Sequence, residues 1–231
     1  MCIRDRTNNW EMIEKAINFV IENQMEDGSI RWAAKSLEAP KDDSLLTGCC
    51  SIYKSLICAI NCSSQLNREN PNWTKSLKKL ENAIKNKPES FDKTWESKKR
   101  FSMDWYYPVL CGAIVGKKAE ERINSQWNNY VLNEKGCLCV SDQPWVTIAE
   151  TAELAIALIK IQEKDKAAKL LSWIKVYTDN DGAYWMGRQI VEKVFWPMEK
   201  PGWTSAAVIL AYDALHSFSK GSKIFLDDHL I

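Results

Sequence analysis

The chain has 231 residues, of which 45% are hydrophobic and 26% are charged, a composition typical of a globular domain rather than a disordered segment. The formal net charge is +1 and the basic residues form no stripe, so the electrostatic footprint of a nucleic-acid-binding protein is missing. Because no run of about 18 uncharged apolar residues occurs, we expect no transmembrane segment.

The first six residues, 1–6 (MCIRDR), resemble a translated sequencing adapter and are left out of the fold prediction. We expect one domain of helical hairpins over 7–219, a C-terminal tail over 220–231, and a natural N-terminus that is missing. The chain has eight cysteines but only two histidines, and no secretory signal is visible. This pattern predicts reduced, core-packed thiols in a cytoplasmic protein without a metal site or a cofactor.

Apolar residues at helical spacing predict a series of helices along the chain. The first is amphipathic and ends at the turn Asp27–Gly28, and later helices begin near Pro108, Pro144 and Pro201. Short extended pieces are expected around 137–140 and 184–186. In chain order, the expected helices are 10–21, 44–62, 73–85, 105–115, 120–132, 145–161, 166–177 and 203–215.

Two kinds of helix alternate in this series, one amphipathic and one lined with Ala, Gly, Ser and Cys. The turn glycines Gly136 and Gly182 mark two of the repeats. Small residues allow helix backbones to approach closely, so we expect the small-residue helices to form an inner layer and the amphipathic helices to lie outside it. The predicted fold class is all-α, an α/α toroid built from helical hairpins.

Four stretches carry a resemblance to a known family: QMEDGSIRW, WVTIAETAELAIALIKI, NDGAYW and EKPGWTSAAVILAYDAL. They resemble the repeats of the prenyltransferase and squalene-cyclase family, which folds as an α/α toroid. The resemblance implies a prenyltransferase-like transferase or a terpene cyclase that holds a small-molecule or lipid-like isoprenoid in an aromatic-lined cavity. The chain lacks the cyclase Asp-x-Asp-Asp motif, and Trp203 stands where the zinc-binding His would precede Thr204.

Three acidic residues are the candidate catalytic groups. Asp104 begins a helix crowded with aromatic residues, and it is either an acid, a base or a helix cap. Glu150 and Glu153 are three residues apart in an apolar helix and therefore share one face. If that face looks into a cavity, burial and mutual repulsion raise one pKa and create a proton donor. The alternative is a solvated stripe on the helix surface.

The candidate substrate-binding residues are mainly aromatic, because aromatic faces stabilise carbocations and also stack on sugar rings. The alternative for each of them is packing between hairpins, with the arginine on the surface. The candidates are Asp43, Trp105, Tyr106, Tyr107, Trp145, Trp185, Arg188 and Trp203.

Two other functions remain open at this point. A carbohydrate-active α/α barrel would use paired carboxylates and aromatic platforms. A non-catalytic helical-repeat module would bind a partner without a concave site of convergent polar groups.

Overall fold

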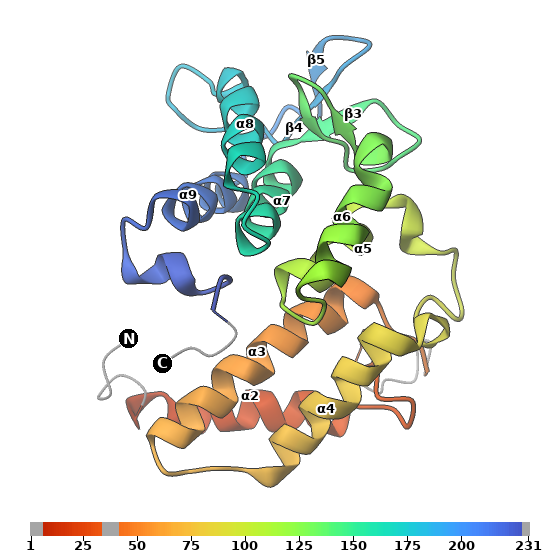
Figure 1. Cartoon of the computed structure of the whole chain (residues 1–231), viewed down its shortest axis with the longest axis vertical. Coiled ribbons are helices and arrows are strands. Elements are labelled where there is room, and N and C mark those ends of the chain that lie inside the picture. The colour runs from red at the N-terminus through yellow and green to blue at the C-terminus, as the bar shows by residue number, and fades with distance from the viewer. Residues whose placement is uncertain (1–6, 34–41, 228–231) are drawn as a thin grey trace. The chain divides into compact units, whose positions relative to one another are not determined.

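The computed structural model describes residues 7–33 and 42–227, and most of these residues are helical (Figure 1). The contacts between residues define two compact units: unit 1 extends to Lys98, and unit 2 covers Lys99–Asp227. In the described part of the chain, no helix is both long and apolar enough to cross a membrane.

In the described part of unit 1, the helices α2, α3 and α4 pack against one another. Trp10 of the first helix stacks on Trp73 of the third, with ring centroids 5.6 Å apart, and both rings are buried. The Asn70 side chain accepts a hydrogen bond from the backbone N–H of Asn72 and so caps the third helix. The elements are α2 (Trp10–Glu22), α3 (Leu46–Gln65), α4 (Pro71–Asn86) and the short 3-10 helix η1 (Pro88–Ser90).

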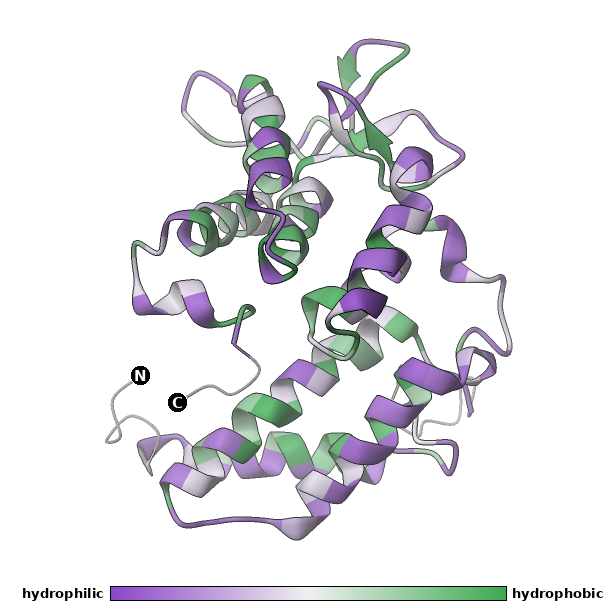
Figure 2. Cartoon of the chain, viewed as in Figure 1, coloured by the Kyte–Doolittle hydropathy of each residue, from purple (hydrophilic) through white to green (hydrophobic). Residues whose placement is uncertain are grey.

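Unit 2 is arranged around one central helix, α7 (Ile148–Lys160), which contacts α5, α8 and α9. Ten of its thirteen residues are buried, and its alanines allow these neighbours to approach closely. Figure 2 shows the contrast between the largely hydrophobic α7 and the largely hydrophilic α6. The other helices are α5 (Ser102–Leu110), α6 (Lys117–Tyr130), α8 (Lys164–Ile174), α9 (Gly202–His216), and the 3-10 helices η2 (Lys98–Arg100), η3 (Lys175–Tyr177) and η4 (Lys220–Lys223).

The helices of unit 2 alternate as the sequence predicts. The small-residue helices α5, α7 and α9 are neighbours in that order, since α7 contacts both of the others. The amphipathic helix α6 packs on α5, and α8 packs on both α7 and α9. The two kinds of helix therefore occupy two layers within this unit.

Two small antiparallel sheets belong to unit 2 and were only partly predicted. The expected helix over 145–161 begins three residues late, because Trp145, Val146 and Thr147 form a strand before it. The backbone N–H of Ile148 then donates to the carbonyl of Met186, where the chain turns into α7. The strands are β1 (Val131–Leu132) with β2 (Gly136–Cys137), and β3 (Trp145–Thr147), β4 (Gly187–Gln189) and β5 (Val194–Phe195) in the order β3-β4-β5.

The seven cysteines in the described residues are free thiols, and four of them are buried. Cys49 is 1% exposed, and its sulfur accepts a hydrogen bond from the backbone N–H of Ile30. Burial raises the pKa of the Cys49 thiol to about 12. The four buried thiols therefore act as small packing groups, as expected of core-packed cysteines, whereas Cys58, Cys62 and Cys139 are only half-buried.

Candidate active site

The centre of the candidate site is the carboxyl group of Glu153 on α7. Its two oxygens accept hydrogen bonds from the phenol groups of α5, at 2.7 Å from Tyr106 Oη and 3.1 Å from Tyr107 Oη. Tyr106 is fully buried, whereas Glu153 and Tyr107 are part-buried. The contact between α5 and α7 thus brings together three residues that the sequence marks as candidates.

The protonation of Glu153 is unusual for a glutamate. Burial raises its pKa from the ordinary 4.5 to about 7, opposed by the hydrogen bond from Tyr106 and assisted by the negative charge of Glu150. Burial and the nearby Glu153 also raise the pKa of Tyr106 well above its ordinary value, so this phenol keeps its proton and serves as a donor. Near neutral pH a substantial fraction of Glu153 therefore carries a proton that it can give away.

Glu150 lies one turn before Glu153 on the same helix face, where Cβ atoms three residues apart are about 5–6 Å from each other. It is part-buried in the first turns of α7. The thiol of Cys139 shares a hydrogen bond with it, and burial together with the charge of Glu150 raises the pKa of Cys139 to about 12. The thiol thus remains protonated as a donor toward the carboxylate.

The segment before α7 holds these groups in place. The Thr151 hydroxyl accepts the backbone N–H of Cys137 at 2.8 Å and donates to the carbonyl of Thr147 at 2.6 Å. Gly136 has φ +134°, and a Cβ atom there would stand 2.8 Å from Thr151 Oγ1 and 2.9 Å from Val146 Cγ1. Strand β2 can therefore lie this close to α7 only with glycine at position 136.

Asp104 and Trp105 are in the first turn of α5, and both are buried. Their backbone carbonyls accept hydrogen bonds from the Arg122 guanidinium of α6, and Trp105 Nε1 donates to the Arg122 carbonyl. The Trp105 ring is 4% exposed and stacks on Tyr130 at 5.2 Å. The environment of Trp105 is that of a packing residue between α5 and α6, the alternative that the sequence left open.

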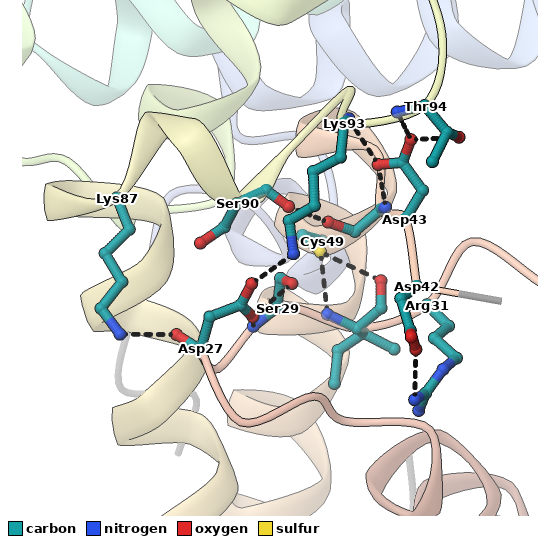
Figure 3. Close-up of polar contacts among 12 residues, drawn as sticks. Asp27, Ser29, Arg31, Asp42, Asp43, Cys49, Lys87, Ser90, Lys93 and Thr94 are labelled. Atoms are coloured by element: carbon teal, nitrogen blue, oxygen red, sulfur yellow. Dashed lines mark hydrogen bonds and ion pairs between the residues drawn. The ribbon is translucent and has the colours of Figure 1, made fainter. Parts of the chain in front are cut away.

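Asp43 lies in unit 1, three residues before the first residue of α3, and is fully buried. Figure 3 shows its polar contacts. Its carboxylate accepts hydrogen bonds from the backbone N–H groups of Ser44, Lys93 and Thr94 and from the Thr94 hydroxyl. Despite the opposing effect of burial, these donors lower the pKa of Asp43. These hydrogen bonds therefore have a structural role, because they hold the loop after η1 against the segment that leads into α3.

The remaining candidates lie on or beside the β3-β4-β5 sheet of unit 2. Trp145 belongs to β3, and its indole N–H donates to the carbonyl of Trp196 at 2.7 Å. Arg188 of β4 lies over the ring of Phe195, and Trp185 stacks on the same ring at 5.0 Å. Trp203 begins α9 and is 56% exposed, so its ring lies at the surface of unit 2.

Across residues 7–33 and 42–227, no three or more His, Cys, Asp or Glu side chains gather as they would around a metal ion.

Comparisons with known proteins favour carbohydrate chemistry. No protein-family model matches the chain. It is 42% identical over 216 residues to the MMP endo-(1,4)-3-O-methyl-α-D-mannosidase of Mycolicibacterium hassiacum, covering 94% of this chain and 59% of that protein. The chain thus spans less than two thirds of the length of this relative.

The solved structures that resemble the chain are those of the α-1,6-mannanase GH76A of Salegentibacter sp. HEL1_6. An inactive variant in complex with α-1,6-mannotetraose has a TM-score of 0.62 at 14% identity, covering 95% of this chain and 67% of that one. The enzyme without substitutions has a TM-score of 0.61 over the same shares. Because these mannanases are α/α toroids, the predicted fold class is confirmed.

The resemblance to the prenyltransferase and squalene-cyclase family is wrong, and so are the transferase activity and the lipid-like substrate that it implied. The relative is named as a mannosidase and the structural neighbours as mannanases that bind mannose oligosaccharides. The error has a physical reason. Alanine-rich helices joined by glycine turns serve hairpin packing in any α/α toroid, so they report the fold and carry no information on the reaction. The comparisons support the carbohydrate-active alternative instead.

Sequence reasoning missed two residues of this region. Cys139 was treated only as a core thiol, although it is the recorded hydrogen-bond partner of Glu150. Trp196 was not among the candidates, because nothing in its local sequence shows that the Trp145 indole contacts it. Both partnerships join segments that only the folded chain brings together.

Proposed function

We propose that this chain is an endo-acting glycoside hydrolase that cleaves α-mannosidic bonds in a polysaccharide carrying 3-O-methyl groups, with Glu153 as the proton donor. The observation that carries the proposal is the carboxyl group of Glu153, whose pKa of about 7 suits a general acid at neutral pH. Support for the substrate class comes from the 42% identity to a 3-O-methyl-mannosidase.

Glycoside hydrolysis needs a carboxylic acid and a carboxylate. Glu153 gives its proton to the glycosidic oxygen as the bond between that oxygen and the sugar C1 breaks. The carboxylate left on Glu153 is then stabilised by the phenol groups of Tyr106 and Tyr107. Glu150 is assigned the ionised role, as the group that assists addition of water at C1. Glu150 takes the proton that water loses as it adds to C1, and transfer of one proton from Glu150 to Glu153, directly or through solvent, returns both carboxyl groups to their starting states.

The test is hydrolysis of α-1,4-linked 3-O-methylmannose oligosaccharides, followed by chromatography of the products. We expect internal cleavage by the full chain and a loss of at least about 100-fold in rate for Glu153→Gln, the usual effect of removing a general acid. Glu121→Gln is the matched control, because the Glu121 side chain on α6 is 64% exposed. Equal rates for Glu153→Gln and the unsubstituted chain would remove Glu153 from the mechanism.

A further inference from the structure

One face of the β3-β4-β5 sheet, which carries Trp145, Gln189 and Val194, holds the Trp196 side chain at the surface of unit 2. The register pairs Thr147 with Gly187, and the backbone N–H of Trp196 donates to the Gly187 carbonyl at 3.0 Å. Since side chains alternate along a strand, Val194 and Trp196 share a face, and the part-buried Phe195 points to the other one. Val194 is 49% exposed and Trp196 is 58% exposed.

Trp145 supports Trp196 from below. Its ring meets the Trp196 ring edge-on, with centroids 5.2 Å apart, and its indole N–H donates a hydrogen bond to the Trp196 carbonyl. A Cβ atom on Gly187 would overlap Trp145 Nε1 and lie 2.8 Å from the Val146 carbonyl oxygen. Only glycine at position 187 therefore lets the Trp145 indole cross the sheet and reach Trp196.

Polar groups on this face are few. Gln189 of β4 lies opposite Trp145 and Val194, and its side-chain oxygen accepts the backbone N–H of Glu192. Gln189 is half-buried and Trp196 is 58% exposed, so the Gln189 amide N–H groups and the Trp196 indole N–H are donors that a bound sugar can reach. The face thus offers a large apolar area with a small number of hydrogen-bond donors, as sugar-binding surfaces do.

From this geometry we infer that Trp196, with Trp145 beneath it and Gln189 at its side, is a binding subsite for an O-methylated mannose residue of the polysaccharide. The inference rests on the proposed function for the kind of ligand. An O-methyl group replaces a hydroxyl donor by an apolar carbon, which gains from contact with the indole and valine side chains. Unmethylated mannose would place a polar hydroxyl against the same apolar side chains and would gain less from that contact.

The subsite is connected to the candidate acid through the chain itself. Strand β3 carries Trp145 and continues directly into α7, where Glu150 and Glu153 lie in the first two turns. With about 3.3 Å per strand residue and 1.5 Å per helix residue, the backbone at Trp145 is within about 15 Å of the backbone at Glu150. The strand that carries Trp145 therefore brings the candidate subsite within the length of one oligosaccharide from the start of the helix that carries the carboxyl groups.

The experiment measures binding by isothermal titration calorimetry in the Glu153→Gln background, so that no ligand is consumed. The probes are α-1,4-mannose oligosaccharides of equal length with and without 3-O-methyl groups. We expect Trp196→Ala to weaken binding of the methylated probe about tenfold, as loss of an aromatic anchor does, and to change binding of the unmethylated probe much less. Trp145→Phe keeps an aromatic ring but removes the indole N–H, and we expect it to weaken binding of the methylated probe less than Trp196→Ala does.

Trp32→Ala is the matched control, because Trp32 of unit 1 is 46% exposed and also meets a second indole edge-on, at 5.1 Å from Trp95. The inference is overturned if Trp196→Ala binds the methylated probe as its parent does, if Trp32→Ala weakens binding equally, or if the parent binds neither probe. If the methylated probe binds in a way that depends on Trp196 but the unsubstituted chain hydrolyses nothing, the proposed function is wrong and the subsite stands.

Discussion

Replacing Glu153 by glutamine should make the protein more stable above neutral pH. The pKa of Glu153 is about 7 in the folded chain against an ordinary 4.5, so between these values the folded state holds a proton that the unfolded state has lost. Stability therefore falls as the pH rises through this window. At about 1.4 kcal/mol for each pH unit between the two pKa values, the full cost above pH 7 is at most about 3.5 kcal/mol, and access of solvent to this part-buried group reduces it.

Glutamine carries no charge and therefore avoids this cost at any pH. We expect the Glu153→Gln variant to match the unsubstituted chain near pH 4.5 and to exceed its free energy of unfolding by roughly 1–3 kcal/mol at pH 8. Urea denaturation at both pH values measures the difference, and Glu121→Gln should show none, since the Glu121 side chain is 64% exposed. An advantage that is absent at pH 8, or equal at both pH values, would refute the raised pKa and with it the proton donor.

Two further variants test the surroundings of this group. Tyr106→Phe removes a hydrogen bond that lowers the pKa of Glu153, so the pH profile of hydrolysis should move upward, and a profile that stays in place would contradict the contact. Gly136→Ala places a Cβ atom 2.8 Å from Thr151 Oγ1 and should cost about 2 kcal/mol or more in urea denaturation. Gly202→Ala, with no atom within 4 Å of its Cβ position, should stay within about 0.5 kcal/mol, and equal losses would contradict the argument.

The helices were predictable because their apolar residues repeat at helical spacing. The helix predicted over 10–21 is α2 (Trp10–Glu22), and the one predicted over 203–215 is α9 (Gly202–His216). The strands were harder, because each has only two or three residues, too few for an alternating pattern. Trp145 was included in the following helix because the apolar run continues from β3 into α7 without a break.

The carboxyl pair was predictable for a different reason. Glutamates inside an alanine-rich helix are exceptional, since burying a charge is costly, so Glu150 and Glu153 stood out without any knowledge of the fold. Their partners did not stand out in the same way. Which phenol reaches Glu153 depends on the packing of α5 against α7, and which thiol reaches Glu150 depends on the loop before β3. Neither contact can be read from the periodicity of the sequence, because each joins segments that are far apart along the chain.

The buried thiols give the folded chain a low chemical reactivity at these positions. Alkylating reagents attack the thiolate, which a thiol with a pKa of about 12, such as Cys49, rarely forms at neutral pH. Once the chain opens, the same sulfur regains an ordinary pKa and free access to the reagent. The rate at which Cys49 reacts with a labelling reagent therefore reports how often unit 1 unfolds locally around this residue.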